Sequence, residues 1–235
     1  TYYIYETFIG RVLTYSCLGL FTFMSGFLLG GKYKFTGSLF NSQVKKFYLK
    51  RILRFYPLFF IATIALWLID FNSLKASLMG LIGAAPFVRE SPKTLWYISM
   101  LMIFYLITPI INRKSLKYKI ILSALFIGVF GLLKILSVLD VDTRFIYNLC
   151  FYCLGIILGS EIRIVKYSNK IMCLLIILYA VLLLALNYFS IINSYVVLIL
   201  GGIGVFIIFG FSACIDSKSK IIRKVLNILS YSSMV

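Results

Sequence analysis

Long apolar stretches separated by short polar segments run along almost the whole chain. Seven stretches have about the 17 to 25 residues that a helix needs to cross the hydrocarbon of a membrane. Both faces of each stretch are apolar, which favours membrane-spanning helices over the alternating strands of a barrel. The predicted spans cover residues 12–30, 54–70, 95–112, 118–137, 145–161, 170–188 and 193–215.

Two further apolar segments are too short to cross a membrane. An eighth stretch begins near Val225 and stops at Val235, so we expect a truncated span there. Residues 76–87 are apolar but few, which favours a re-entrant or interfacial segment. The pattern predicts an all-α, polytopic transmembrane helix bundle that forms a single domain over residues 1–235, with seven complete spans and one truncated.

The composition agrees with a membrane protein. Hydrophobic residues make up 62% of the chain and charged residues 13%, and the mean hydropathy is +1.01. A soluble domain could not cover so much apolar surface. The net charge of +17 could suit nucleic acid, but the cations are spread over four loops on one side of the predicted membrane, so no nucleic-acid partner is predicted.

Lysine and arginine alternate between the predicted loops as the positive-inside rule requires. Of the 24 cations, 18 lie in four loops on the same side, which is therefore the cytoplasmic side. The opposite loops are close to neutral, and residue 1 is predicted to be external. The cytoplasmic surface should attract the head groups of anionic membrane lipids and anionic metabolites.

The chain contains no histidine, which excludes a Ser/His/Asp triad and nearly every zinc enzyme in these residues. Cys150 and Cys153 form a C-x-x-C pair without a second pair, so no metal site is predicted. Pairs of glycines four residues apart inside spans are typical of close helix packing. They are Gly26 with Gly30, and Gly155 with Gly159.

The stretch "KKFYLKRILRFYPLFF", residues 45–60, places a cationic run directly before an apolar one. If the run is helical, Lys50, Arg51 and Arg54 share a face. Pro57 is predicted to disturb and break this helix at the membrane surface, where two guanidinium groups beside a broken helix would suit phosphate recognition. An anchor at the lipid head groups needs only positive charge, so the residues alone leave both interpretations open.

Four segments taken in order resemble the membrane-bound acyltransferase 3 family. They are "LFTFMSGFLL", "FYLKRILRFYPLFF" with its Arg-x-x-Arg and proline, "LWYISMLMIFYLITPII" and a terminal "ILSYSSMV". The resemblance spans most of the 235 residues, although no single segment is specific. It implies a fold of about ten spans and the transfer of acetyl or other short acyl groups from cytoplasmic acyl-CoA to surface or secreted glycans.

The resemblance also implies roles for particular residues. Arg51 and Arg54 match the motif implicated in handling acyl-CoA, and the neighbouring Lys50 and Lys46 would help to hold its phosphates. Further motif residues that would shape the cavity are Ser25, Gly26, Phe27, Pro57, Leu95 and Trp96. The family's key histidine would precede Thr1, so the catalytic residue is unknown, and we expect an incomplete chain that is inactive by itself.

These observations lead to one expected function and two alternatives. The expected protein is an acyltransferase of the bacterial cytoplasmic membrane with no bound cofactor, which uses acyl-CoA, most simply acetyl-CoA, as co-substrate and a glycan or another hydroxyl-bearing acceptor. The first alternative is an export protein that moves a polysaccharide or a lipid-linked glycan without acyl transfer. The second is a sensor or assembly partner without chemistry.

Overall fold

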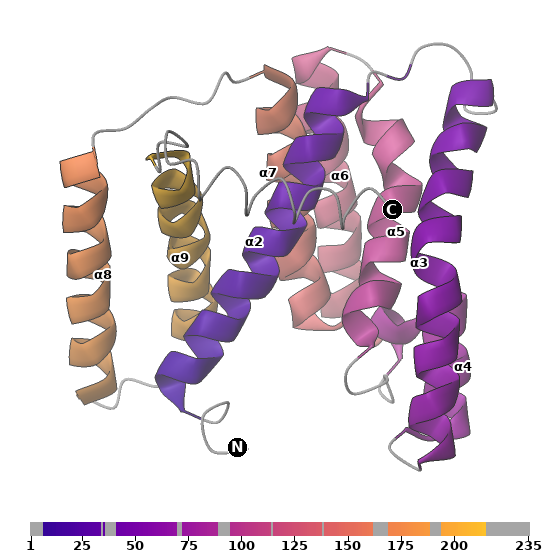
Figure 1. The fold of residues 1–235 in the computed structure, drawn as a ribbon, viewed down its shortest axis with the longest axis horizontal. Coiled ribbons are helices and arrows are strands. Elements are labelled where there is room, and N and C mark those ends of the chain that lie inside the picture. Colours follow the sequence, from indigo (N-terminus) through magenta and orange to yellow (C-terminus); the bar gives the residue numbers. More distant parts are fainter. Residues whose placement is uncertain are drawn as a thin grey trace, which may run out of the picture. The chain divides into compact units, whose positions relative to one another are not determined.

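The computed structural model describes residues 7–33, 35, 41–69, 72–88, 95–113, 115–137, 139–161, 169–188 and 194–214, and these residues form helices and no strands (Figure 1). The helices are α2 (Phe8–Lys32), α3 (Ser42–Leu68), α4 (Leu74–Ile82), the short 3-10 helix η1 (Ala85–Phe87), α5 (Trp96–Ile111), α6 (Leu116–Ile135), α7 (Thr143–Glu161), α8 (Asn169–Tyr188) and α9 (Ser194–Cys214). The predicted all-α class is confirmed for this part of the chain.

Each of the seven predicted spans corresponds to one long helix. Among the described residues, four helices are long and apolar enough to cross a membrane, namely Phe8–Lys32, Ser42–Leu68, Leu116–Ile135 and Thr143–Ser160. Shorter apolar stretches lie in α5, α8 and α9, so the count of seven spans stays a prediction. The predicted eighth span near Val225 lies outside the described residues.

The structure corrects the prediction that Pro57 breaks the helix. α3 begins at Ser42, so the cationic run lies in its first turns, and the helix continues through Pro57 to Leu68. Proline removes only one backbone hydrogen bond, the one that would reach the carbonyl of Leu53. Membrane helices tolerate such a loss where neighbouring groups satisfy the freed carbonyl.

The short apolar segment predicted at residues 76–87 forms α4 and η1. The hydroxyl of Ser73 caps α4 by accepting a hydrogen bond from the backbone N–H of Ala76 at 3.1 Å. Gly83 ends the helix with a φ of 83°, a left-handed conformation that favours glycine. The nine residues of α4 are too few to cross a membrane, as the sequence predicted.

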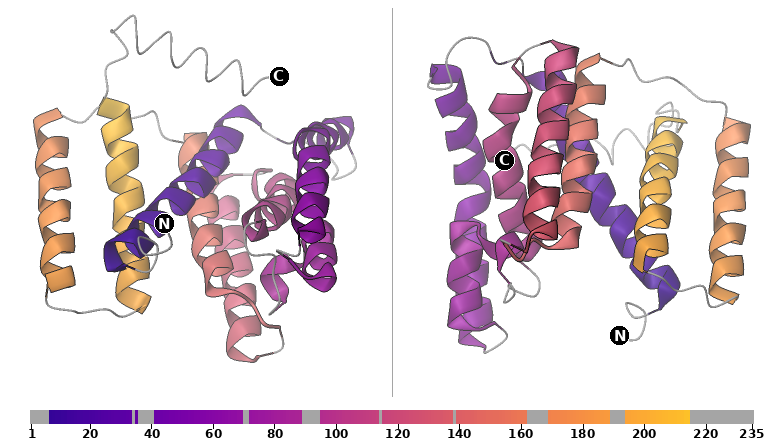
Figure 2. Two further views of the ribbon diagram at one scale, coloured as in Figure 1. Left: turned by 60° about the horizontal axis from the view of Figure 1, so that its bottom comes forward. Right: turned by 180° about the vertical axis from the view of Figure 1, so that it is seen from behind.

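The chain divides into two compact units, residues 21–162 and residues 1–20 with 163–235. In the larger unit the core is built from apolar side chains of α2, α3, α5 and α7, including the fully buried Phe104, Phe145 and Tyr152. The rings of Phe104 and Tyr152 are stacked with centroids 5.0 Å apart. α6 and α7 lie side by side in this unit, which both Figure 1 and Figure 2 show.

The predicted close packing of glycines is confirmed where α2 meets α7. A Cβ atom on Gly26 would lie 2.3 Å from the carbonyl oxygen of Tyr152, and one on Gly30 would lie 2.3 Å from that of Ile156. In return, a Cβ atom on Gly159 would lie 2.0 Å from the carbonyl oxygen of Phe27. The backbones of the two helices therefore touch, as small residues allow.

The smaller unit combines the first residues of α2 with α8 and α9. The Ser16 hydroxyl donates to the carbonyl of Gly201 at 3.1 Å, and the Tyr179 hydroxyl donates to the carbonyl of Leu200 at 2.7 Å. Phe8 and Val12 form a small buried apolar cluster with Leu183, Val197 and Leu200, and Tyr179 packs against it.

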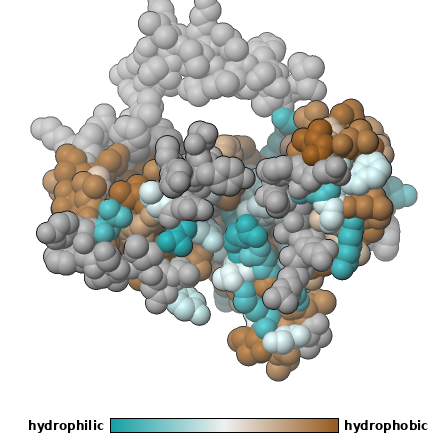
Figure 3. Space-filling view, turned by 90° about the horizontal axis from the view of Figure 1, so that it is seen from below, coloured by the Kyte–Doolittle hydropathy of each residue, from teal (hydrophilic) through white to brown (hydrophobic). Residues whose placement is uncertain are grey.

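Large apolar side chains cover much of the outer surface of the helices, which is the arrangement that lipid requires. On α3, for example, Leu58 is 73% exposed and Ile61 is 63% exposed. Figure 3 shows hydrophobic residues, in brown, at the surface of one face of the molecule. The protein is therefore a multi-pass membrane protein.

Candidate functional site

The two arginines of the predicted cationic site differ in burial. Arg51 is half-buried, and its guanidinium carbon lies 5.1 Å from the ring centroid of Tyr105 and 5.8 Å from that of Phe47. Arg54 is exposed, and its guanidinium carbon lies 5.5 Å from the ring centroid of Phe55. Three residues of helix turn the chain by about 300°, so the two arginines leave α3 about 60° apart. Of the two, Arg51 is the one that contacts α5.

Ser25, on α2, meets the same tyrosine of α5. The hydroxyl oxygens of Ser25 and Tyr105 lie 3.2 Å apart, and either group can donate the hydrogen bond. Tyr105 is buried and links a motif residue of α2 with a motif residue of α3. We call Ser25, Arg51 and Tyr105 the polar trio. It joins a cation and two hydroxyl groups from three helices.

The two residues that follow Ser25 shape the helix contact. Gly26 lies against the backbone of α7, and Phe27 stacks on Phe23 with ring centroids 6.1 Å apart. Because Gly26 fixes how closely α2 approaches α7, it also sets the position of Ser25 one residue earlier. These two residues thus support the polar trio through packing.

Three lysines come together where α2 ends and α3 begins. Lys32, Lys46 and Lys50 line a cavity of about 330 Å³, and all three side chains are exposed. The other lining residues are Tyr33, Phe35, Gln43 and Phe47. We call this cavity the basic pocket. It brings the predicted Lys46 and Lys50 together and adds Lys32 from a different helix.

The aromatic residues of the basic pocket form a compact group of rings. Tyr33 and Phe35 are stacked with centroids 5.7 Å apart, and Phe47 meets Tyr33 edge-on at 5.2 Å. Since the guanidinium of Arg51 also lies near the ring of Phe47, this ring separates the basic pocket from the polar trio. An anion with an attached aromatic group would find both charge and stacking surface in the pocket.

Asn112, directly after α5, forms hydrogen bonds to the end of α2 and to Phe35, which form one wall of the basic pocket. Its amide nitrogen donates to the carbonyl of Leu29 at 3.2 Å and to that of Tyr33. Its backbone carbonyl accepts from the N–H of Phe35 at 3.4 Å. The carbonyls at the end of a helix lack partners within the helix, so this side chain caps α2.

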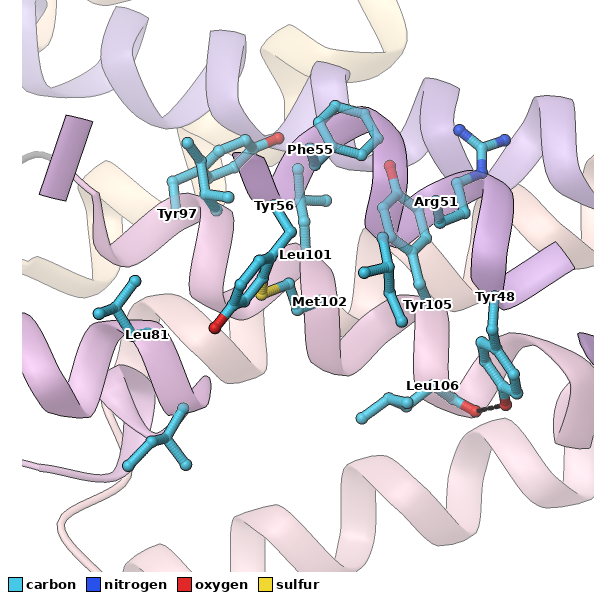
Figure 4. Close-up of a pocket in the computed structure, with 13 residues that line it drawn as sticks. Tyr48, Arg51, Phe55, Tyr56, Leu81, Tyr97, Leu101, Met102, Tyr105 and Leu106 are labelled. Atoms are coloured by element: carbon cyan, nitrogen blue, oxygen red, sulfur yellow. Dashed lines mark hydrogen bonds between the residues drawn. The ribbon is translucent and has the colours of Figure 1, made fainter. Parts of the chain in front are cut away.

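An apolar groove lies between α3, α4 and α5, next to the polar trio (Figure 4). It has a volume of about 650 Å³, within the range of roughly 300–1,000 Å³ typical of small-molecule sites. Leu101 and Met102 of α5 and Leu81 of α4 are among its lining residues, and Tyr105 and Arg51 form part of its wall. The Tyr48 hydroxyl donates to the carbonyl of Leu106 at 2.9 Å and joins α3 to α5 at one end.

The remaining motif residues lie away from the polar trio. Leu95 is buried just before α5, and the guanidinium carbon of Arg144 lies 4.3 Å from the centroid of a Trp96 ring. Arg144 also donates from Nε to Asp142 at 2.7 Å. Trp96 precedes Tyr105 by nine residues, about 13 Å along the helix. Trp96 of the Leu-Trp motif therefore contacts the start of α7, at the end of α5 that is farther from Arg51.

Pro57 lies in α3 six residues after Arg51, about 9 Å along the helix, and is exposed. It lines neither the basic pocket nor the apolar groove. In the described part of the chain no group of three metal-ligating side chains comes together.

Sequence reasoning missed three residues of the site. Lys32 was counted only as a loop cation, while Tyr105 and Asn112 were treated as part of the predicted apolar span at residues 95–112. A tyrosine inside a span and an asparagine directly after one are the signals that could have drawn attention to the last two, because buried polar groups in a membrane require partners.

The described residues thus bring together cationic side chains, hydroxyl groups and an apolar groove. The model of the acyltransferase 3 family, described as an acyltransferase domain, matches residues 1–235. The chain therefore belongs to the membrane acyltransferase 3 family and is a membrane acyltransferase. No curated protein and no solved structure matches the chain.

Proposed function

We propose that the protein transfers an acetyl or other short acyl group from cytoplasmic acyl-CoA to a hydroxyl of a glycan at the outer face of a bacterial cytoplasmic membrane. Membership of the acyltransferase family supports the reaction class. The single observation that carries the choice of donor is the basic pocket, where three lysines from two helices converge beside Arg51.

Coenzyme A offers the charges that such a pocket recognises. Its 3′-phosphate and pyrophosphate are strongly anionic, and lysine binds phosphate as a point charge. In this proposal Lys32, Lys46 and Lys50 hold the phosphates, and the rings of Tyr33 and Phe47 lie where the adenine could stack. Arg51 directly follows Lys50 and lies about one helical turn after Phe47 on α3, within reach of the remainder of the donor.

The reaction itself is a simple exchange at the thioester. The oxygen of the acceptor hydroxyl forms a bond to the carbonyl carbon, the carbon–sulfur bond breaks, and the hydroxyl proton leaves so that free coenzyme A departs as the thiol. The described residues bind and orient the donor in this scheme. Because an arginine at bilayer depth costs about 2.5–3.5 kcal/mol on insertion scales, Arg51 should face a hydrated cavity when donor is absent.

Membranes that contain the intact protein provide the test. Incubation with acyl-CoA labelled in the acyl group should move label into glycan, and replacement of Lys32, Lys46 and Lys50 by alanine together should raise the KM for acyl-CoA. Lys45→Ala is the matched control, because Lys45 is an exposed cation of the same helix that does not line the basic pocket. Glycan binding without consumption of acyl-CoA would favour the export alternative instead.

A further inference from the structure

We propose that Tyr105 is a positioning residue of the acyl transfer, with its ring holding the guanidinium of Arg51 and its hydroxyl holding Ser25. The proposal rests on the proposed function, because it concerns how the donor-binding arginine is kept in place. It assigns a role to a residue in the middle of an apolar helix to which the family resemblance gives no role.

The geometry around Tyr105 supports this role. Its side chain is 8% exposed, the Arg51 guanidinium carbon lies 5.1 Å from the ring centroid, and the hydroxyl lies 3.2 Å from that of Ser25. The ring also stacks on Phe55 of α3 with centroids 5.9 Å apart. Figure 4 shows the hydroxyl of Tyr105 and the guanidinium of Arg51 pointing the same way, away from Tyr48 and Leu106. One side chain of α5 thus contacts both α2 and α3.

Arg51 needs such a support. Within the described part of the chain, its guanidinium makes ring contacts with Tyr105 and Phe47 and no hydrogen bond or ion pair. An arginine side chain has many rotamers, and the planar face of an aromatic ring restricts them while leaving the N–H groups free to meet an anion. The ring of Tyr105 therefore orients the guanidinium without consuming its hydrogen-bond donors.

Ser25 gains a fixed orientation from the same residue. A serine inside a helix can turn its hydroxyl back to a carbonyl of its own helix. In this structure the Ser25 hydroxyl is instead within hydrogen-bond distance of Tyr105, a residue 80 positions later. A shift of Tyr105 would consequently disturb Ser25 and Arg51 together.

The test measures kcat and the KM for acyl-CoA in membranes that contain the intact protein. Tyr105→Phe keeps the ring, so the KM should stay near the wild-type value, while kcat falls about three- to tenfold as Ser25 loses its partner. Tyr105→Leu also removes the ring under Arg51, so the KM should rise as well. The double variant Ser25→Ala with Tyr105→Phe should be no worse than the poorer single variant, because both changes break the same hydrogen bond.

The matched control is Tyr179→Phe, which removes a tyrosine hydroxyl bonded to the carbonyl of Leu200 in the other unit and should leave both constants unchanged. Thermal unfolding of each variant separates loss of fold from loss of positioning. Additive losses in the double variant, or wild-type constants in Tyr105→Leu, would overturn the role of Tyr105 while acyl transfer by the wild type keeps the proposed function intact. Absence of transfer by the wild type from any acyl-CoA would overturn both.

Discussion

The carbonyl oxygen of Tyr152 lies so close to Gly26 that a Cβ atom on residue 26 would be only 2.3 Å from it. Real Cβ atoms do not come so close to a backbone oxygen, so α2 and α7 can keep this contact only while residue 26 is glycine. The glycine of the Ser-Gly-Phe motif is thus explained by helix packing, and the serine before it by the polar trio.

Gly26→Ala should therefore destabilise the protein by about 1–3 kcal/mol, because the added methyl group forces the two helices apart. Thermal unfolding in detergent measures the effect. Gly128→Ala is the control, since a Cβ atom there would meet nothing within 4 Å on α6. That change should be neutral or stabilise by about 0.5–1 kcal/mol, because alanine favours a helix more than glycine does. Equal stability of both variants would contradict the close contact.

Asn112→Ala should lower stability by about 1–3 kcal/mol, because the Tyr33 carbonyl loses the side-chain amide and the Leu29 carbonyl keeps only the backbone N–H of Tyr33. It should also raise the KM for acyl-CoA, since the end of α2 forms one wall of the basic pocket. Thr63→Val offers a comparison, because the Thr63 hydroxyl donates to the carbonyl of Phe59, within its own helix. A KM that stays at the wild-type value in Asn112→Ala would show that this wall does not contact the donor.

Arg144→Lys should destabilise the protein by about 1 kcal/mol although the charge is kept. Lysine loses the planar contact with Trp96 and the hydrogen bond from Nε to Asp142. The KM for acyl-CoA should not change, because this cluster lies at the opposite end of α5 from Arg51. Unfolding curves and kinetics on the same preparation check both statements, and a change of KM would be incompatible with the separation of the two ends.

The predicted orientation in the membrane can be measured with single cysteines in a background that lacks the five natural ones. Lys45 is an exposed residue of α3, and Lys45→Cys should react with a membrane-impermeant maleimide only after the cells are opened so that the reagent reaches the cytoplasmic side. Lys75 is an exposed residue of α4, and Lys75→Cys should react with the same maleimide in intact cells. The reverse pattern would place the basic pocket outside and would remove its access to cytoplasmic acyl-CoA.

The helices could be predicted well because length and apolar content decide what crosses a membrane. α7 was expected at residues 145–161 and begins at Thr143, and the glycine pairs at 26 and 155 were correctly assigned to close packing. The start of α3 was harder to predict, because cations at a helix end are compatible with either a loop or helical turns outside the lipid. The predicted break at Pro57 was wrong, because one missing hydrogen bond does not end a membrane helix.

The site was only partly predictable for a different reason. The family resemblance placed Lys46 and Lys50 near the same phosphates, and both line the basic pocket, but the sequence could not reveal that Lys32 lies beside them from α2. Nor could it reveal that Tyr105 lies between Ser25 and Arg51, since such contacts depend on how α2, α3 and α5 pack. Residues from different helices become neighbours only through tertiary structure.

α3 is longer than a helix needs to be to cross the hydrocarbon layer of a membrane. Its 27 residues extend for about 40 Å, whereas the hydrocarbon layer is about 30 Å thick. On the proposed topology the first turns of α3 therefore stand among the lipid head groups, where anionic phospholipids compete with acyl-CoA for the same lysines. Under the proposed function, enrichment of the inner leaflet in phosphatidylglycerol should therefore slow turnover in the way a competitive inhibitor does.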